Sequence, residues 1–354
     1  MLLFADSFEH YGTTPNNGRD AMLRGLWAQF DISGGFMGVT TDQKRTGSYS
    51  FRMEQNINNK LARFVFGGSG KVVSGVGFGI YLNELPTINT NIYSSFMSLA
   101  NGFIVSIAIQ SDGSLAAYLG GSGGTLIAVS DSLLTAGAFY HIESKLVVDP
   151  VVGDIEIRVN GNIAIKASNI NTGSTNAAGY RFSVTGRSGS TLSVYLDDVF
   201  AWDDIGDFNN DFLGPQRLLT VYANGEISPY DWTTVGAASP HEAIDEVPPD
   251  GDTSYIGAND YASVIDFTLP TLPPEIDRVY GIFVPAYAKL DEAGLGDIQV
   301  SLVSGSEVLT GGDPATLGTD YVYKRFTFDY DPDTDAQITK AAFEAAKIRL
   351  EKTL

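Results

Sequence analysis

Cysteine is absent from the 354 residues, and only three histidines occur, His10, His141 and His241. Without cysteine the chain has no disulfides, no thiolate nucleophile and no zinc site built on sulfur. The histidines lie far apart in the sequence, and none stands at ligand spacing from another, so no histidine metal site is indicated. A Ser-His-Asp triad would need one of these three as its base. We expect His141, which follows Tyr140 inside an alternating segment, to be a structural side chain.

Long apolar runs are also missing. No window approaches the roughly eighteen apolar residues that a membrane-spanning helix needs. The N-terminal segment MLLFADSFEHYG has no basic region and no long apolar stretch, so it does not resemble a secretory signal. We therefore expect no membrane insertion, synthesis in a cytoplasm, and a first strand over residues 2–8.

Basic side chains are scarce. The 22 lysines and arginines face 42 aspartates and glutamates, which gives a net charge of −20. Most of the imbalance falls in residues 205–354, where 25 acidic side chains face 9 basic ones. Such a surface repels phosphate backbones, so nucleic-acid binding is not expected. The acidity either keeps the protein soluble at high local concentration or attracts cations and a basic partner.

Alternation of apolar and polar residues is what the chain has in quantity. Residues 139–161, FYHIESKLVVDPVVGDIEIRVNG, and residues 191–203, TLSVYLDDVFAWD, follow the period of two that marks strands with one face in a core. Asn160-Gly161 is a strong signal for a two-residue hairpin turn. About a dozen such segments with short connections fill residues 2–202, which predicts an all-β, antiparallel jelly-roll sandwich.

Four segments of this half together resemble concanavalin-A-like and laminin-G-like jelly rolls: FADSFEHYG (4–12), TGSYSFRM (46–53), residues 139–161 and YLDDVFAWD (195–203). The resemblance covers residues 1–204 and implies a sandwich fold. It implies little about function, because such folds occur in lectins, glycosidases, adhesion modules and viral structural proteins.

An acidic, glycine-bearing stretch at 203–212 predicts a domain boundary, which places a second domain at residues 205–354. This domain resembles a module that accompanies such jelly rolls in structural proteins of tailed bacteriophages. The matching segments are FLGPQRLLTVYANGE (212–226), DWTTVG (231–236), HEAIDEVPPDGDTSYI (241–256), and residues 276–294 and 331–353.

The C-terminal end of this domain has a helical pattern. The spacing of Ile338, Ala342 and Ala345 or Ala346 predicts a helix over about 336–346. The alternation that follows predicts a final strand over about 347–353. We therefore expect a β-rich second domain with one short helix near the C-terminus.

Carboxylates at both ends of the predicted jelly roll raise the hypothesis of a structural calcium site. Asp6 lies on the first strand, Asp197 and Asp198 lie on the closing strand, and the three would be neighbours if the two ends pair. Oxygen-only ligation suits Ca²⁺. The competing interpretation is that these aspartates cap turns by accepting hydrogen bonds from nearby backbone. No other cofactor is expected.

Glycoside hydrolysis is the enzymatic alternative, because jelly rolls of this kind host it. The reaction needs two carboxylates that face one cleft. The nearest cluster, Glu242-Ala-Ile-Asp-Glu246, lies in the second half and lacks the Glu-x-Asp-x-x-Glu spacing of jelly-roll glucanases. We therefore expect no catalytic residues and no enzymatic activity.

The combined resemblance predicts a non-enzymatic structural component of a tailed-bacteriophage virion, made in the host cytoplasm and placed in the tail, the baseplate or a fibre. Such components assemble as symmetric homo-oligomers, and a trimer would suit a fibre. The expected partners are other virion proteins, further copies of the chain, and a glycan of the host surface. Two alternatives stand beside this prediction: a capsid decoration protein, and a glycan-binding module or glycoside hydrolase of the jelly-roll type.

Overall fold

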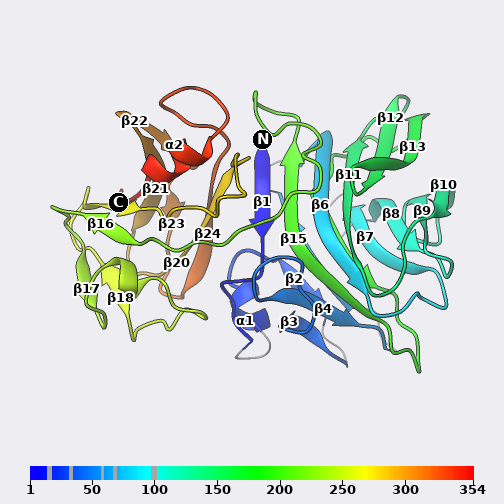
Figure 1. Cartoon of the computed structure of the whole chain (residues 1–354), viewed down its shortest axis with the longest axis horizontal. Coiled ribbons are helices and arrows are strands. Elements are labelled where there is room, and N and C mark those ends of the chain that lie inside the picture. The colour runs from blue at the N-terminus through cyan, green and yellow to red at the C-terminus, as the bar shows by residue number, and fades with distance from the viewer. Residues whose placement is uncertain (14–17, 32–34, 57–59, 67–69, 97–101) are drawn as a thin grey trace.

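The computed structural model describes residues 1–354 except 14–17, 32–34, 57–59, 67–69 and 97–101. Antiparallel strands make up nearly all of its regular structure. Two large sheets draw their strands from residues 2–203, and three smaller sheets draw theirs from residues 225–352. Figure 1 shows these two parts beside each other, with the first strand, β1, at their junction. The prediction of an all-β fold with a short helix near the C-terminus is confirmed.

Sheet A of the jelly roll has eight strands. Its order across the sheet is β13 (Asn162–Ile170), β12 (Gly153–Val159), β11 (Phe139–Val147), β6 (Val73–Leu82), β15 (Ser193–Asp203), β4 (Ser50–Glu54) and β3 (Met37–Thr40). The eighth strand, β1 (Leu2–Asp6), pairs with the second half of β15. Asn160 and Gly161 both adopt positive φ angles, 49° and 83°, between β12 and β13, so the predicted hairpin turn is present.

Sheet B has seven strands and packs against sheet A. Its order is β10 (Thr125–Ser132), β9 (Ser114–Leu119), β8 (Phe103–Ile109), β7 (Thr90–Phe96), β14 (Gly179–Val184), β5 (Lys60–Val65) and β2 (Gln29–Asp31). One helical turn, α1 (Arg19–Met22), follows the first strand and has no counterpart in the predicted pattern.

Aromatic rings dominate the core between the two sheets. Phe4 stacks on Phe64 with ring centroids 4.2 Å apart, and Trp27 lies edge-on to both at 5.5 and 5.7 Å. All three rings are buried. Complete burial of one such side chain contributes about 1.5–3 kcal/mol to stability. Because Phe4 comes from β1 and Phe64 from β5, this core holds the N-terminal strand against sheet B.

The second module contains one six-stranded sheet and two strand pairs. The sheet comprises β16 (Gly225–Ile227), β19 (Val264–Thr268), β25 (Lys347–Lys352), β21 (Asp297–Ser304) and β22 (Glu307–Thr310), with β23 (Ala315–Thr316) beside β21. The pairs are β17 (Thr233–Val235) with β18 (Tyr255–Gly257), and β20 (Ile282–Ala288) with β24 (Val322–Phe328).

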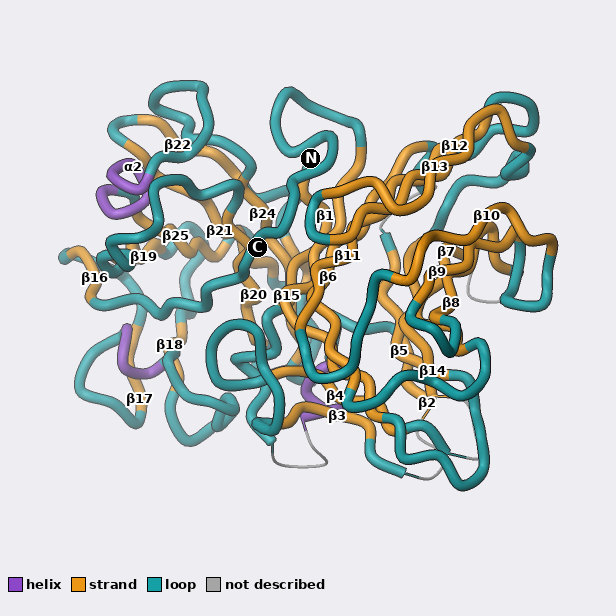
Figure 2. The backbone as a smooth tube through the Cα atoms, turned by 45° about the vertical axis from the view of Figure 1, so that its right-hand side comes forward, coloured by secondary structure: helices purple, strands orange, loops and turns teal. Residues whose placement is uncertain are grey.

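Helix α2 (Lys340–Ala345) lies close to the predicted range and closes the core of this module. Its start is set by Thr339, whose hydroxyl accepts a hydrogen bond from the Ala342 amide at 3.1 Å. Phe343 and the preceding Ile338 are both buried in that core. Figure 2 shows how little helix accompanies the strands: α1, α2 and one 3-10 turn, η2 (His241–Ala243), are the helical segments of the described residues.

Candidate functional site

Glycines on β6 shape the outer face of sheet A. A Cβ atom added to Gly75 would lie 2.2 Å from the ring of Trp202, and one added to Gly77 would lie 2.2 Å from the ring of Phe200. The two aromatic rings of β15 therefore lie flat over β6. His141 of β11 stacks on Phe200 at 5.8 Å, so this face carries a continuous aromatic surface.

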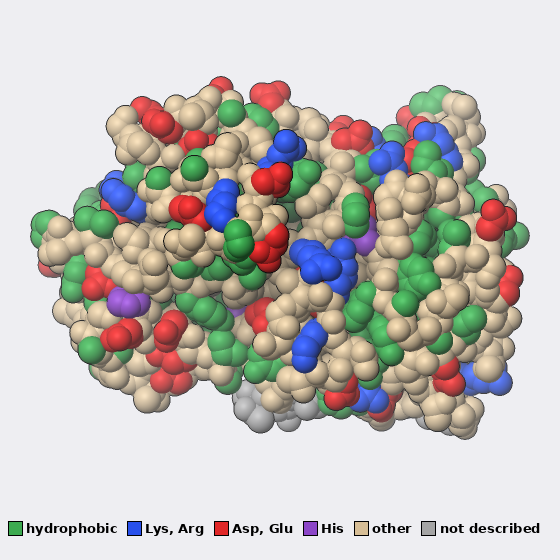
Figure 3. Space-filling view, in the orientation of Figure 1, with side chains coloured by type: hydrophobic (Ala, Val, Ile, Leu, Met, Phe, Trp, Pro, Cys, Tyr) green, Lys and Arg blue, Asp and Glu red, His purple; other side chains and the backbone are tan. Residues whose placement is uncertain are grey.

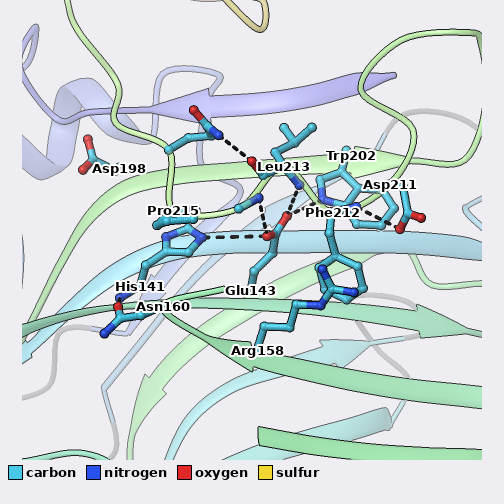
Figure 4. A network of polar contacts seen from close by, with 12 residues as sticks. His141, Glu143, Arg158, Asn160, Asp198, Trp202, Asp211, Phe212, Leu213 and Pro215 are labelled. Atoms are coloured by element: carbon cyan, nitrogen blue, oxygen red, sulfur yellow. Dashed lines mark hydrogen bonds and ion pairs between the residues drawn. The ribbon is translucent and has the colours of Figure 1, made fainter. Parts of the chain in front are cut away.

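The linker between the modules covers this aromatic surface. Residues 211–218, which we call the strap, cross sheet A beside Glu143, a fully buried carboxylate of β11 (Figure 4). Glu143 accepts hydrogen bonds from the backbone amides of Leu213 and Gly214 at 2.8 and 2.9 Å. Phe212 packs between the Arg158 guanidinium, 3.7 Å from its ring centre, and the ring of Trp202.

Charged groups hold the remainder of the strap. Arg45 donates to the Gln216 carbonyl at 2.5 Å and to Asp198 at 2.6 Å, and the Leu218 amide donates to Asp198 at 2.8 Å. His141 lies beneath, 1% exposed, with its Nε2 atom 3.9 Å from Glu143. The chain itself therefore occupies the outer face of sheet A around His141.

A row of polar side chains crosses the outer face of sheet B. These side chains pair in register across neighbouring strands of the sheet, from β2 at one end to β9 at the other. The residues next to three of them in the sequence, Phe64, Phe182 and Ile107, point into the core. Because side chains alternate along a strand, the row lies on the opposite face. We call it the arginine row, and it consists of Gln29, Arg63, Arg181, Ser94, Ser106 and Tyr118.

Two like charges are directly opposed in this row. Arg63 of β5 pairs in register with Arg181 of β14, an arrangement that is unfavourable for cross-strand neighbours. Burial lowers the pKa of Arg181 to about 10, with a further contribution from Arg63. Burial also lowers the pKa of Arg63. In a protein of net charge −20, this face of sheet B therefore carries two positive charges on neighbouring strands.

Arg181 is held by contacts that leave part of its hydrogen-bonding capacity unused. Its guanidinium lies 4.0 Å from the ring centre of Phe103. Among the described residues no carboxylate lies within ion-pair distance of Arg181, and its buried Nε atom has no hydrogen-bond partner there. A planar fork with an unused donor is suited to a ligand carboxylate or sulfate.

Small polar side chains form the floor beside the arginines. The Ser94 and Ser106 hydroxyls are 2.9 Å apart, and Asn91 donates to Ser94 at 3.1 Å and to Ser183 at 2.6 Å. These four side chains are all buried. Their mutual hydrogen bonds fix the floor and therefore fix the strands that carry the arginines.

Tyr118 ends the row on β9. Its hydroxyl accepts a hydrogen bond from Asn89 at 3.4 Å. A phenol can donate to a sugar oxygen or move a proton, so Tyr118 is the one group of the row besides the arginines with acid–base capacity.

The first and closing strands of the jelly roll pair, with Asp6 opposite Val199, and each of the three aspartates of the calcium hypothesis has hydrogen-bond partners within the chain. Asp6 accepts hydrogen bonds from the Trp27 indole, the Tyr11 hydroxyl and the Phe8 amide, at 2.7, 2.7 and 2.8 Å. Asp197 accepts from the backbone amides of residues 45 and 46, and Asp198 binds Arg45. In the described part of the chain no three His, Cys, Asp or Glu side chains gather as metal ligands would. The calcium site stays a prediction, which equilibrium dialysis with Ca²⁺ tests.

The buried Asp197 predicts a specific pH dependence of stability. Burial, and then the charge of Asp198, raise the pKa of Asp197 to about 7 from an ordinary value near 3.8. A carboxyl whose pKa is raised on folding binds more protons in the folded state, so its contribution to stability falls as pH rises from about 4 to above 7. Relative to Asp197→Asn, the wild-type protein should lose roughly 2–4 kcal/mol over that range.

Chemical denaturation of both proteins at pH 4 and pH 8 measures this change. Asp204→Asn, at an exposed position next to the end of β15, is the matched control and should follow the wild type. A wild-type protein that gains stability relative to Asp197→Asn as pH rises would contradict the assigned shift.

The sequence-based choice of residues missed the arginine row. Arg63 and Arg181 lie on strands far apart in the chain, and no local motif surrounds either. The candidate cluster Glu242 to Glu246 lies around η2 in the second module, where Glu246 accepts a hydrogen bond from the Ser254 hydroxyl. Among the described residues no helix is long and apolar enough to span a bilayer.

Comparison with known proteins gives fold-level similarity. No family model matches the chain, and no curated protein matches its sequence. The chain is similar to an endo-β-1,4-glucuronan lyase of the fungus Trichoderma reesei, with 15% identity over 50% of this chain and 92% of that one and a TM-score of 0.39. It is also similar to the cellulose-induced protein Cip1, with 18% identity over 56% and 96% and a TM-score of 0.43. It is similar as well to the alginate lyase Aly36B, with 13% identity over 56% of this chain and 96% of that one and a TM-score of 0.35.

These similarities correct one expectation. The similar structures include a glucuronan lyase, an alginate lyase and sialidases, all of which are enzymes. The prediction that the chain is not an enzyme is contradicted by this set of similar structures. At these identities and TM-scores, the chemistry of this chain has to be argued from its own residues.

Proposed function

We propose that the arginine row binds an acidic polysaccharide. The observation that carries the proposal is the register pair of Arg63 and Arg181 on the outer face of sheet B, next to the aromatic ring of Phe103. A ligand carboxylate or sulfate beside Arg181 would accept a hydrogen bond from its unused donor, and the positive charge of Arg63 on the neighbouring strand would add to the attraction. A neutral ligand carries no negative charge to interact with the two arginines.

The length of the row favours a polymer over a small anion. It crosses six neighbouring strands, from β2 to β9, which corresponds to about 24 Å at the usual strand spacing. Gln29 at one end and Tyr118 at the other provide side chains that hydrogen-bond to hydroxyls. A chain of sugars can contact both ends at once, whereas a single small anion contacts only the arginines.

Affinity electrophoresis and calorimetry test this function. We expect polygalacturonate, alginate or hyaluronate to bind and dextran not to bind. Because the contacts are ionic, the affinity should fall as salt is raised. Equal binding of dextran and the polyuronates, or binding that salt does not change, would contradict an arginine-based site.

Cleavage of the same polymer is a second candidate function. Elimination from a uronate needs its carboxylate neutralised and a group that moves a proton, and the row contains the arginines and Tyr118 for these roles. Incubation with a polyuronate should then release unsaturated products that absorb in the ultraviolet. Tyr118→Phe should stop the release while binding persists.

The virion assignment also continues as a proposal. A tail, baseplate or fibre component that binds the acidic glycan of a host surface is compatible with the row, and no comparison supports or tests it. Mass spectrometry of purified phage particles would test the location, and the solution mass would test the proposed homo-oligomer.

A further inference from the structure

A large cleft lies between the jelly roll and the second module. Its volume is about 1570 Å³, and it is lined by β1, the linker, the β17–β18 pair and β20 with its following loop. Figure 3 shows the front surface hollowed between these two parts of the molecule. The arginine row contributes no residue to this cleft.

Direct contacts between the modules hold the walls of the cleft in place. The Tyr323 amide of β24 donates to the Arg24 carbonyl at 2.6 Å, and the Leu2 amide of β1 donates to Asp329 at 2.8 Å. Asn209 of the linker also donates to Asp329, at 2.8 Å. The cleft is therefore a fixed feature of the fold, bounded by hydrogen bonds from three segments.

Three residues that line this space carry polar atoms without partners. Within the described residues His10 Nε2, the Tyr222 hydroxyl and the Tyr323 hydroxyl are buried and have no hydrogen-bond partner, and all three residues line the cleft. Tyr323 is only 4% exposed, and its ring lies 5.3 Å from that of His10. A buried polar group without a partner costs about 1–3 kcal/mol, so a ligand that supplied hydrogen bonds to these groups would be favoured.

This wall of the cleft is uncharged at neutral pH. Burial lowers the pKa of His10 to about 3, so its imidazole is neutral. Burial raises the pKa of Tyr222 to about 12, and burial together with Tyr287 raises the pKa of Tyr323 further. The three groups therefore offer neutral donors and acceptors, which match hydroxyl and ether oxygens.

Aromatic faces stand beside these groups. Tyr287 of β20 stacks on Tyr321 with ring centroids 4.9 Å apart, and it lies 4.7 Å from Tyr323. Flat rings next to several hydrogen-bonding groups suit a ligand with apolar faces and polar edges, as a pyranose has.

The rim of the cleft is acidic. Asp250, Asp291 and Glu292 line it, and Asp252 pairs with Lys289. These carboxylates repel an anionic ligand. The cleft and the arginine row therefore select for opposite charge.

We propose that the cleft between the modules is a second carbohydrate site, which binds a short neutral oligosaccharide through His10, Tyr222 and Tyr323. The volume exceeds what a single sugar fills and accommodates several units. This inference is independent of the acidic-polysaccharide function, because the two sites share no residue and lie on different surfaces.

Calorimetric titration of the full chain with the tetrasaccharides of cellulose, xylan, starch and chitin tests the proposal. We expect at least one of them to bind, and Tyr323→Phe and Tyr222→Phe each to raise its Kd about three- to tenfold. Tyr261→Phe removes a hydroxyl at a position that is 73% exposed and should leave the Kd unchanged. Without ligand, Tyr323→Phe should melt no lower than the wild type, because the hydroxyl it removes has no partner.

Three results would overturn the proposal: no heat with any of the four tetrasaccharides, a wild-type Kd for both Tyr323→Phe and Tyr222→Phe, or tighter binding of tetragalacturonate than of the neutral series by the Arg181→Ala protein. Arg181→Ala distinguishes the two proposals. This variant should still bind the neutral tetrasaccharides. If it loses only the binding of acidic polymers, the proposed site in the cleft is unaffected.

Discussion

Replacing Arg181 with alanine should weaken binding of an acidic polysaccharide by about ten- to a hundredfold. A hydrogen bond to a charged group contributes roughly 1.5–3 kcal/mol, and each 1.4 kcal/mol corresponds to a factor of ten in Kd. Arg181 has the buried Nε without a partner among the described residues, and it lies directly opposite Arg63. Its removal therefore takes away both a fork-shaped donor and half of the positive potential. Calorimetry with polygalacturonate at fixed ionic strength measures the change.

Matched variants separate this local effect from bulk charge. Lys44→Ala removes one positive charge from an exposed loop of the same jelly roll and should change the Kd little. Arg181→Lys keeps the charge but loses the planar fork, and we expect it to recover only part of the affinity. If Lys44→Ala weakens binding as strongly as Arg181→Ala, the polymer responds to net charge and not to the arginine row.

The largest effect on stability is expected from Asp6. Its carboxylate is 2% exposed and accepts hydrogen bonds from Trp27, Tyr11 and the Phe8 amide. Asp6→Ala leaves three buried donors without a partner, and each costs about 1–3 kcal/mol. We expect a loss of roughly 4 kcal/mol or more, which is a large share of the 5–15 kcal/mol of a typical domain.

Urea denaturation followed by tryptophan fluorescence measures this loss. Asp6→Asn retains one acceptor oxygen and should lose about half as much. Asp204→Ala, an exposed aspartate of the same module, should stay within about 0.5 kcal/mol of the wild type. An Asp6→Ala protein that is as stable as Asp204→Ala would show that the Trp27 and Tyr11 donors find other partners.

Local patterns explain why much of the fold could be predicted. The alternation over residues 139–161 predicted the strands β11 and β12, and Asn160-Gly161 predicted the turn between β12 and β13. Both signals are local, because the alternation of side chains along a strand and a positive φ angle depend on neighbouring residues. The C-terminal helix was predictable for the same reason, and its observed start follows from one cap, Thr339. The division into two domains at residues 204 and 205 stays a prediction. The structure describes all of residues 204–224, and they contain no strand.

Function was harder to predict, because the residues that matter meet only through pairing between distant strands. The sequence by itself determined an all-β chain without cysteine, with an acidic second half. Only the tertiary structure decided that Arg63 faces Arg181, that Asp6 is a core acceptor for Trp27, and that the strap covers Glu143. The physical reason is that strand order and docking of modules depend on total burial of apolar surface across the whole chain, which no local period encodes.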